Sequence, residues 1–127
     1  MKIGDFNIAF FVCYDLRFPV WSRNIKLQYH AAIYLANWPK KRRDHWSTLL
    51  KARAIENQAY VIGVNRIGED PNKHDYPGHS QVIDELGNYL IAPQEIEGVF
   101  ITTLNKNTLE ANRQKFGFLN DRDAFTM

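Results

Sequence analysis

Three short apolar runs, each followed by a polar segment, constrain most strongly how this chain can fold. The runs at residues 8–12, 31–35 and 60–64 are rich in β-branched and aromatic residues and too short for typical helices, so each predicts a buried strand. Residues 43–57 carry apolar side chains at three- and four-residue steps without Gly or Pro, which predicts a helix. This alternation predicts parallel neighbouring strands joined by right-handed crossovers.

The remaining segments predict shorter elements. These are a helix over residues 20–27 after Pro19, a polar loop over 68–78, a hairpin of 80–83 with 89–91, a strand over 99–103, and a helix from Asn107 to residue 115. The hairpin is antiparallel, whereas the first strands are parallel. We therefore expect an α/β fold with a mixed sheet.

The composition is typical of a globular protein with one core. With 127 residues, of which 45% are hydrophobic and 24% charged, the chain is expected to form a single unit. The formal net charge of +2 is too small to indicate nucleic acid or membrane binding. The longest apolar run, residues 8–13, is far shorter than the about 20 residues of a membrane-spanning helix, and the start lacks a signal-peptide pattern. We therefore expect a soluble, cytoplasmic protein.

The sequence contains one cysteine, Cys13, which excludes an internal disulfide and a CxxC redox pair. The four histidines, His30, His45, His74 and His79, show no metal-binding spacing such as HExxH. We therefore expect no metal site and no cofactor.

Polar or reactive residues follow the predicted strands, at Cys13, Asn37, Trp38, Asn65 and Arg66. Loops at the carboxyl ends of parallel strands are where open α/β sheets usually bind ligands, so these residues are the candidates for a site. A cysteine on a sharp turn after a strand can act as a nucleophile, with backbone N–H groups nearby to hold an oxyanion. A small buried hydrophobic residue is the alternative for Cys13. The placement alone leaves both interpretations open.

The residues around Cys13 decide between them. The sequence from Cys13 to Pro19, CYDLRFP, resembles the nucleophile signature of the nitrilase superfamily of carbon–nitrogen hydrolases. Further segments resemble blocks of this family in the same order, at residues 37–39, 45–46, 52–58, 65–68, 78–80 and 84–87. The resemblance covers residues 8–121, and residues 18–24 are most similar to bacterial ω-amidases.

The resemblance implies an α-β-β-α sandwich fold, of which this chain is the C-terminal half, and a Glu-Lys-Cys triad. In that family, the cysteine attacks an amide carbonyl to form a thioester and release ammonia, and water then releases the acid. Carried over by motif, Cys13 is the nucleophile and the backbone N–H of Tyr14 contributes to the oxyanion hole. Covalent catalysis of this kind divides amide hydrolysis into two easier steps.

The resemblance also implies a substrate, a short 2-oxo acid amide such as 2-oxoglutaramate, whose carboxylate needs a cationic partner. Arg17 is the candidate, because arginine suits bidentate carboxylate binding; its alternative is a structural ion pair near Asp15 or Glu56. Trp38 is similar to the family's aromatic pocket wall, and its alternative is buried area under a loop.

Other polar residues are interpreted as structural. Arg53 and Glu56 lie three apart on the predicted helix and are read as scaffold. Asn65 is expected to order a loop end, with a pocket-facing role as the alternative. A pair of His79 with Cys13 is the least favoured hypothesis.

The chain departs from the family pattern in one respect that matters for activity. The family's general-base Glu and its Lys lie in the N-terminal half of the domain, and no residue here matches them, since Lys2 is too near the start. We therefore expect residues 1–127 to be a partial domain that is inactive alone. We expect it to associate either as a homo-oligomer or with a separate N-terminal half, because half of the sandwich would leave apolar surface exposed.

Three rival interpretations remain. The chain could be a non-catalytic half-domain that only dimerises or complements a partner. It could belong to another amidase of the family, such as one acting on deaminated glutathione. The basic run at residues 40–43, flanked by Trp38 and Trp46, could bind nucleic acid, but four such charges are more often a solvated loop, and we expect no nucleic acid partner.

Overall fold

Three parallel strands form the centre of the sheet in the computed structural model, which describes residues 1–123. They are β2 (Phe6–Val12), β3 (Ala31–Ala36) and β4 (Tyr60–Asn65), formed by the three apolar runs. Their register places Val12 opposite Leu35 and, one strand further, Leu35 opposite Val64. The three carboxyl ends therefore meet at one edge of the sheet.

Antiparallel strands extend this centre on both sides. β1 (Lys2–Ile3) pairs with β2, β7 (Ser80–Ile83) pairs with β4, and β8 (Tyr89–Gln94) pairs with β7. The order across the six-stranded sheet is β1-β2-β3-β4-β7-β8. The predicted α/β fold with a mixed sheet is confirmed.

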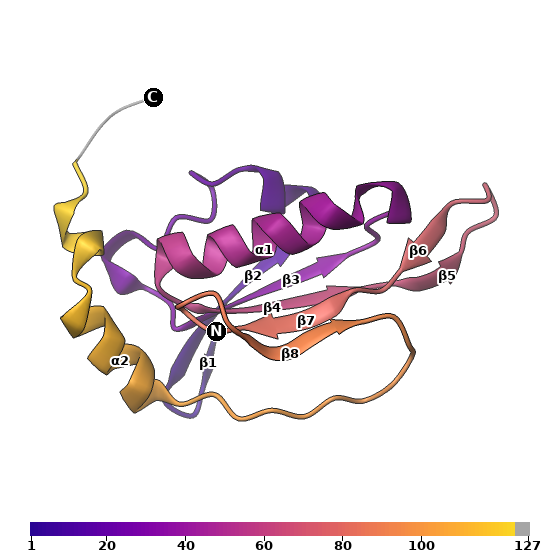
Figure 1. Cartoon of the computed structure of the whole chain (residues 1–127). Helices are drawn as coiled ribbons and strands as arrows, with labels where there is room; N and C mark the ends of the chain where they lie inside the picture. Colours follow the sequence, from indigo (N-terminus) through magenta and orange to yellow (C-terminus); the bar gives the residue numbers. More distant parts are fainter. Residues whose placement is uncertain (124–127) are drawn as a thin grey trace.

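Helix α1 (Arg43–Asn57) covers one face of the sheet, as Figure 1 shows. Trp46, Leu50 and Ala54, four residues apart, are fully buried on its inner side. Gly63 of β4 permits this close packing, because a Cβ atom there would lie 2.4 Å from Leu50 Cδ1. Within residues 1–123, no helix is long and apolar enough to cross a membrane.

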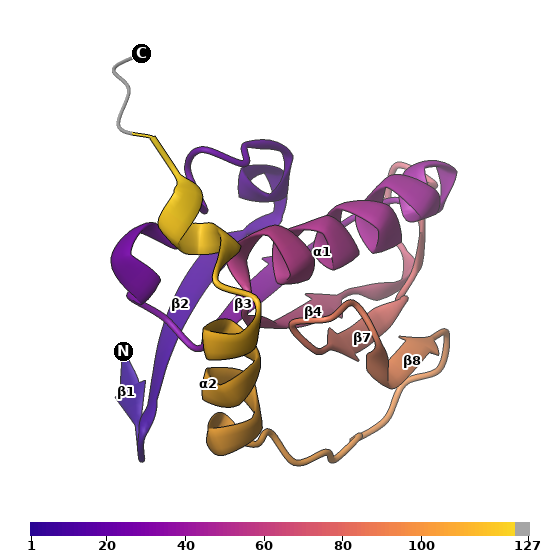
Figure 2. The ribbon, with the colours of Figure 1, turned by 60° about the vertical axis from the view of Figure 1, so that its left-hand side comes forward.

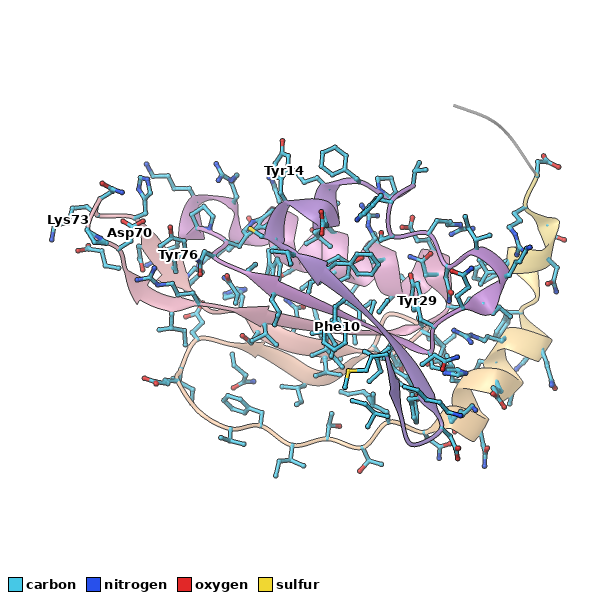
Figure 3. The ribbon with its side chains drawn as sticks, turned by 180° about the vertical axis from the view of Figure 1, so that it is seen from behind. Phe10, Tyr14, Tyr29, Asp70, Lys73 and Tyr76 are labelled. Atoms are coloured by element: carbon cyan, nitrogen blue, oxygen red, sulfur yellow. The ribbon has the colours of Figure 1, made fainter. Side chains whose placement is uncertain are left out.

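The opposite face of the sheet is only partly covered. Helix α2 (Lys106–Lys115) buries Leu109 against Ala31 and Tyr60, and the segment 95–105 runs along the same side (Figures 1 and 2). Large apolar side chains nearer the carboxyl ends of the strands stay exposed on this face; they are Phe10 (Figure 3), Val12, Leu35 and Val64. We call these four residues the open face.

The predicted helix over residues 20–27 is wrong. The chain forms turns there and a single 3₁₀ turn, η2 (Ile25–Leu27), in which Lys26 and Leu27 have positive φ. Buried Asn24 explains the difference, since its backbone N–H donates to Asn57 Oδ1 and its side chain donates to the Asn57 carbonyl. These bonds to α1 replace the hydrogen bonds that a regular helix would make.

Two further expectations are corrected. Residues 99–103 form no strand, and Val99 and Ile101 are 90% and 89% exposed, so their apolar pattern finds no neighbouring strand among residues 1–123. The expected polar loop at 68–78 contains a hairpin of β5 (Ile67–Glu69) and β6 (Asp75–Pro77).

The C-terminal helix is confirmed, although its N-terminal cap lies two residues earlier than expected. Asn105 caps α2 by accepting a bond from the Thr108 N–H at 3.0 Å, in place of the expected Asn107.

Candidate active site

Cys13 stands at the point where β2 ends and the 3₁₀ helix η1 (Cys13–Arg17) begins. Its φ of +43° is left-handed, a conformation that a non-glycine residue rarely adopts. Asp15 stabilises the turn by accepting a bond from the Val12 N–H at 2.9 Å, and the side chain of Leu16 is fully buried beneath it. The turn leaves the thiol half-buried at the sheet edge.

The thiol borders a cavity of about 430 Å³ at the carboxyl ends of the parallel strands. Its lining residues come from the turn after β2 and the loop after β3; they are Cys13, Tyr14, Arg17, Asn37, Trp38, Pro39 and Arg42. A second hollow of about 510 Å³ lies on the side of the open face and shares Cys13 and Asn37 with the first. The structure thus brings Cys13, Tyr14, Arg17 and Trp38 together, as the sequence predicts.

Arg17 lies against an aromatic wall. Its guanidinium carbon is 4.8 Å from the centroid of the Trp38 ring, and its Nη2 donates to His45 Nδ1 at 3.4 Å. Within residues 1–123, Arg17 forms no ion pair with Asp15 or Glu56. Its charge is therefore available to the cavity.

Trp38 is both a cavity wall and a core residue, since only 3% of it is exposed. Its indole Nε1 donates to the carbonyl of Arg42 at 2.8 Å, and its ring lies 5.5 Å from that of Trp46. The two interpretations of Trp38 are thus compatible.

Asn65 holds the Trp38 loop in place. Its Oδ1 accepts from the Trp38 N–H at 2.6 Å, and its Nδ2 donates to the carbonyls of Trp38 and Gly78 at 3.0 and 2.7 Å. Because the side chain is 7% exposed and fully engaged, the geometry favours the structural role.

Arg53 supports the cysteine turn from below. Its Nη1 donates to Glu56 Oε1 at 2.9 Å, and its Nη2 donates to the carbonyl of Leu16 at 2.7 Å. The guanidinium is nearly buried, so this link between α1 and η1 is shielded from solvent. The scaffold role expected for Arg53 and Glu56 agrees with these contacts, while the contact with Leu16 was not apparent from the sequence.

The side chain of Tyr14 projects outward from the turn (Figure 3), with 64% of the residue exposed and its ring 5.3 Å from that of Phe18. The group expected to take part in the chemistry is the backbone N–H of Tyr14, which follows Cys13 directly in the chain. That oxyanion role stays a prediction.

His79 is engaged away from Cys13. Its Nε2 donates to Glu95 Oε1 at 2.7 Å, its Nδ1 lies 3.5 Å from Ser47 Oγ, and it lines neither hollow beside the thiol. The geometry gives no support to a Cys13–His79 pair. Within residues 1–123, no group of three or more His, Cys, Asp or Glu side chains is placed to hold a metal ion.

Two features at the edge of the site were missed by sequence reasoning. Arg42 lines the cavity, although the run 40–43 was interpreted as a solvated loop; its position shortly after a strand end was the available signal. The β5–β6 hairpin reaches the same rim, where Lys40 Nζ lies 2.8 Å from Asp75 Oδ2. In the hairpin, the Tyr76 hydroxyl donates to Asp70 Oδ2 at 3.0 Å (Figure 3), and this bond raises the pKa of Tyr76.

Comparison with known proteins gives concordant matches. Residues 1–114 match the carbon-nitrogen hydrolase family. The chain is 50% identical over 117 residues to omega-amidase YafV from Yersinia enterocolitica, covering 91% of this chain and 45% of that protein. It is 43% identical over 113 residues to 2-oxoglutaramate amidase from Paenarthrobacter nicotinovorans, covering 88% of this chain and 38% of that protein.

The fold has a counterpart among solved structures. XC1258 from Xanthomonas campestris, a CN-hydrolase superfamily protein with an arsenic adduct in its active site, superimposes with a TM-score of 0.94 at 40% identity. The match covers 100% of this chain and 51% of that one, so the chain spans about half the length of its relatives. The resemblance drawn from the sequence motifs is confirmed, and the chain belongs to the carbon–nitrogen hydrolase family.

Proposed function

We propose that this chain forms part of an enzyme that hydrolyses the amide C–N bond of a small 2-oxo acid amide, with Cys13 as the nucleophile. The observation that carries the proposal is the half-buried thiol on a left-handed turn, in one cavity with Arg17 and Trp38. The names of the similar proteins, omega-amidase and 2-oxoglutaramate amidase, support this substrate class.

The proposed reaction proceeds in two steps. The Cys13 thiolate attacks the amide carbonyl carbon, the C–N bond breaks, and the nitrogen leaves as ammonia after gaining a proton, which leaves a thioester on sulfur. Water then attacks the thioester carbonyl, and the C–S bond breaks to give the acid and the free thiol. In both steps the backbone N–H of Tyr14 donates to the oxyanion, and Arg17 pairs with the carboxylate of the substrate.

The cavity lacks two of the groups that this chemistry needs. Neither hollow beside Cys13 is lined by a Glu, Asp or Lys side chain from residues 1–123. We therefore propose that a general base and a second oxyanion donor come from a part of the enzyme outside these 127 residues. On this proposal the chain alone does not hydrolyse amides, since loss of one oxyanion donor lowers rates by about 10²–10³.

The open face supports the same division of the enzyme. Four large apolar side chains on one sheet face are exposed, and three of them, Val12, Leu35 and Val64, line the hollow that Cys13 borders. Monomeric proteins usually cover such a surface. We propose that a second layer packs there, supplied by a separate N-terminal half or by another copy of the chain. A cytoplasmic location stays a prediction.

Complementation tests the proposed function. The chain is mixed with the part of Yersinia enterocolitica YafV that it does not match, and ammonia release from 2-oxoglutaramate is measured. We expect activity in the mixture, none in the chain alone, and none in a mixture with Cys13→Ser, whereas the exposed variant Asn72→Ala retains activity. Equal activity in the mixture with Cys13→Ser would refute the assignment of Cys13 as the nucleophile. Faster hydrolysis of deaminated glutathione than of 2-oxoglutaramate would refute the substrate assignment.

A further inference from the structure

Two arginine residues line the cavity beside Cys13. Arg17 and Arg42 both contribute to its wall, and the remaining lining residues, from Cys13 to Pro39, are neutral among the residues the structure describes. Neither arginine forms an ion pair with a carboxylate within residues 1–123. Two uncompensated cations on one small cavity indicate an anionic ligand.

Trp38 contacts both arginines. Its ring face lies 4.8 Å from the Arg17 guanidinium carbon, while its Nε1 donates to the Arg42 carbonyl at 2.8 Å. The Arg42 N–H also donates to the Pro39 carbonyl at 2.9 Å, which closes the 3₁₀ turn η3 (Lys40–Arg42). The backbone of Arg42 is thus fixed beside the wall on which Arg17 lies.

The neighbouring cations of the same run are engaged elsewhere. Lys40 pairs with Asp75 at 2.8 Å, and Arg43 Nε lies 3.7 Å from Asp44 Oδ1. Hydrogen bonding to His79 lowers the pKa of Glu95, and the charges of Arg43 and Lys40 lower it further. Within the described chain, Arg42 is the member of residues 40–43 that lines the cavity.

We propose that Arg42 is a second specificity-determining residue, and that a carboxylate remote from the scissile amide is held between Arg17 and Arg42. This inference rests on the proposed function and deepens it, because it adds a second arginine to the site that binds the carboxylate of the substrate. A carboxylate offers about four acceptor positions, more than one guanidinium fork can satisfy. The anion also offsets the repulsion between the two cations.

Alkylation of the thiol tests the proposal without requiring hydrolysis. Because Cys13 is the single cysteine, every adduct on the chain reports this site. The rate constants with anionic iodoacetate and neutral iodoacetamide are measured for the 127-residue chain, and their ratio reports the local positive charge. We expect Arg42→Gln to lower this ratio about three- to fivefold. Arg42→Lys retains most of it, and the matched variant Arg43→Gln leaves it unchanged.

An unchanged ratio in Arg42→Gln, or an equal fall in Arg43→Gln, overturns the proposal. Arg42 is exposed, so its replacement is expected to leave the fold intact, and circular dichroism verifies this. Failure of this proposal can be distinguished from failure of the proposed function. If the complemented enzyme fails to hydrolyse 2-oxoglutaramate while the ratio still falls in Arg42→Gln alone, the anion site stands and the substrate assignment fails.

Discussion

The guanidinium carbon of Arg17 lies 4.8 Å from the centroid of the Trp38 ring, so one of the two arginines that line the cavity packs on its largest aromatic side chain. A cation over an aromatic face gains about 0.5–2 kcal/mol, depending on how far it is desolvated. Trp38 therefore connects the charge of the site to the stability of the fold.

Replacement of Trp38 is expected to separate these contributions. Trp38→Phe keeps an aromatic face but removes the N–H donated to Arg42, and it should lower the free energy of unfolding by about 1–2 kcal/mol. Trp38→Ala should lower it by about 3–5 kcal/mol, because the side chain is almost fully buried. Urea unfolding measures both. Trp21, which is 70% exposed, serves as the control. If Trp21→Ala lowers the free energy of unfolding as much as Trp38→Ala does, the stabilising role assigned to Trp38 is wrong.

Asn65→Ala is expected to destabilise the chain through hydrogen bonds. The change leaves the N–H and carbonyl of Trp38 and the carbonyl of Gly78 without this partner, at a cost of about 2–4 kcal/mol. Denaturant titration gives the free energy of unfolding, and exposed Asn72→Ala serves as the control. A change within about 0.5 kcal/mol of that control would show that water replaces the amide.

The free energy of unfolding is expected to decrease as the pH is lowered below neutrality, because of His30. Burial, followed by the charges of Lys106 and Arg113, holds the pKa of His30 below its ordinary value of 6.5, while Glu110 opposes the shift. The Asn7 N–H donates to His30 Nδ1 at 2.8 Å, so this nitrogen is unprotonated in the fold. Below pH 6.5 the unfolded chain binds the proton more readily. The stabilisation is complete above pH 6.5 and is lost as pH falls through the folded value.

The midpoint of urea unfolding between pH 5 and 8 checks this dependence. We expect His30→Gln to have a flatter profile than the unsubstituted chain, whereas His74→Gln, at an exposed position in the hairpin turn, keeps the original slope. Parallel profiles for all three proteins would exclude His30 as the source.

Gly63→Ala is expected to weaken the packing of α1 on β4. The new Cβ would lie 2.4 Å from Leu50 Cδ1 and 2.9 Å from Trp46 Cζ2, which forces the helix or these side chains to move, at about 1–3 kcal/mol. At Gly98 the same substitution meets nothing closer than the Phe100 ring at 3.4 Å. Thermal unfolding compares the two variants, and a smaller loss at Gly63 than at Gly98 would contradict the packing argument.

The central sheet was predictable because each of its strands is determined by the residues of one short segment. Each of the three apolar runs is a strand by composition, and parallel pairing brings Cys13, Asn37 and Asn65 to one edge whatever the remaining chain does. The family resemblance similarly predicted Arg17 as a substrate contact and Trp38 as a pocket wall, and both line the cavity beside Cys13.

The errors arise where distant contacts decide the structure. Residues 20–27 have helical periodicity, but Asn24 bonds to Asn57, 33 residues away, and the segment follows that anchor. Arg42 was missed because the direction of a side chain in a 3₁₀ turn leaves no periodic pattern. The contact of Arg53 with the Leu16 carbonyl spans 37 residues and has no signature in either segment.

The β5–β6 hairpin, finally, allows the chain to change length beside the cavity without disturbing the main sheet. Among the described residues its strands pair with each other and stand apart from the six-stranded sheet, yet the Lys40–Asp75 ion pair links them to the rim of the cavity. Insertions or deletions at its tip shift no register in the main sheet. A change of length at the hairpin tip can therefore alter the entrance to the cavity without displacing the turn at Cys13.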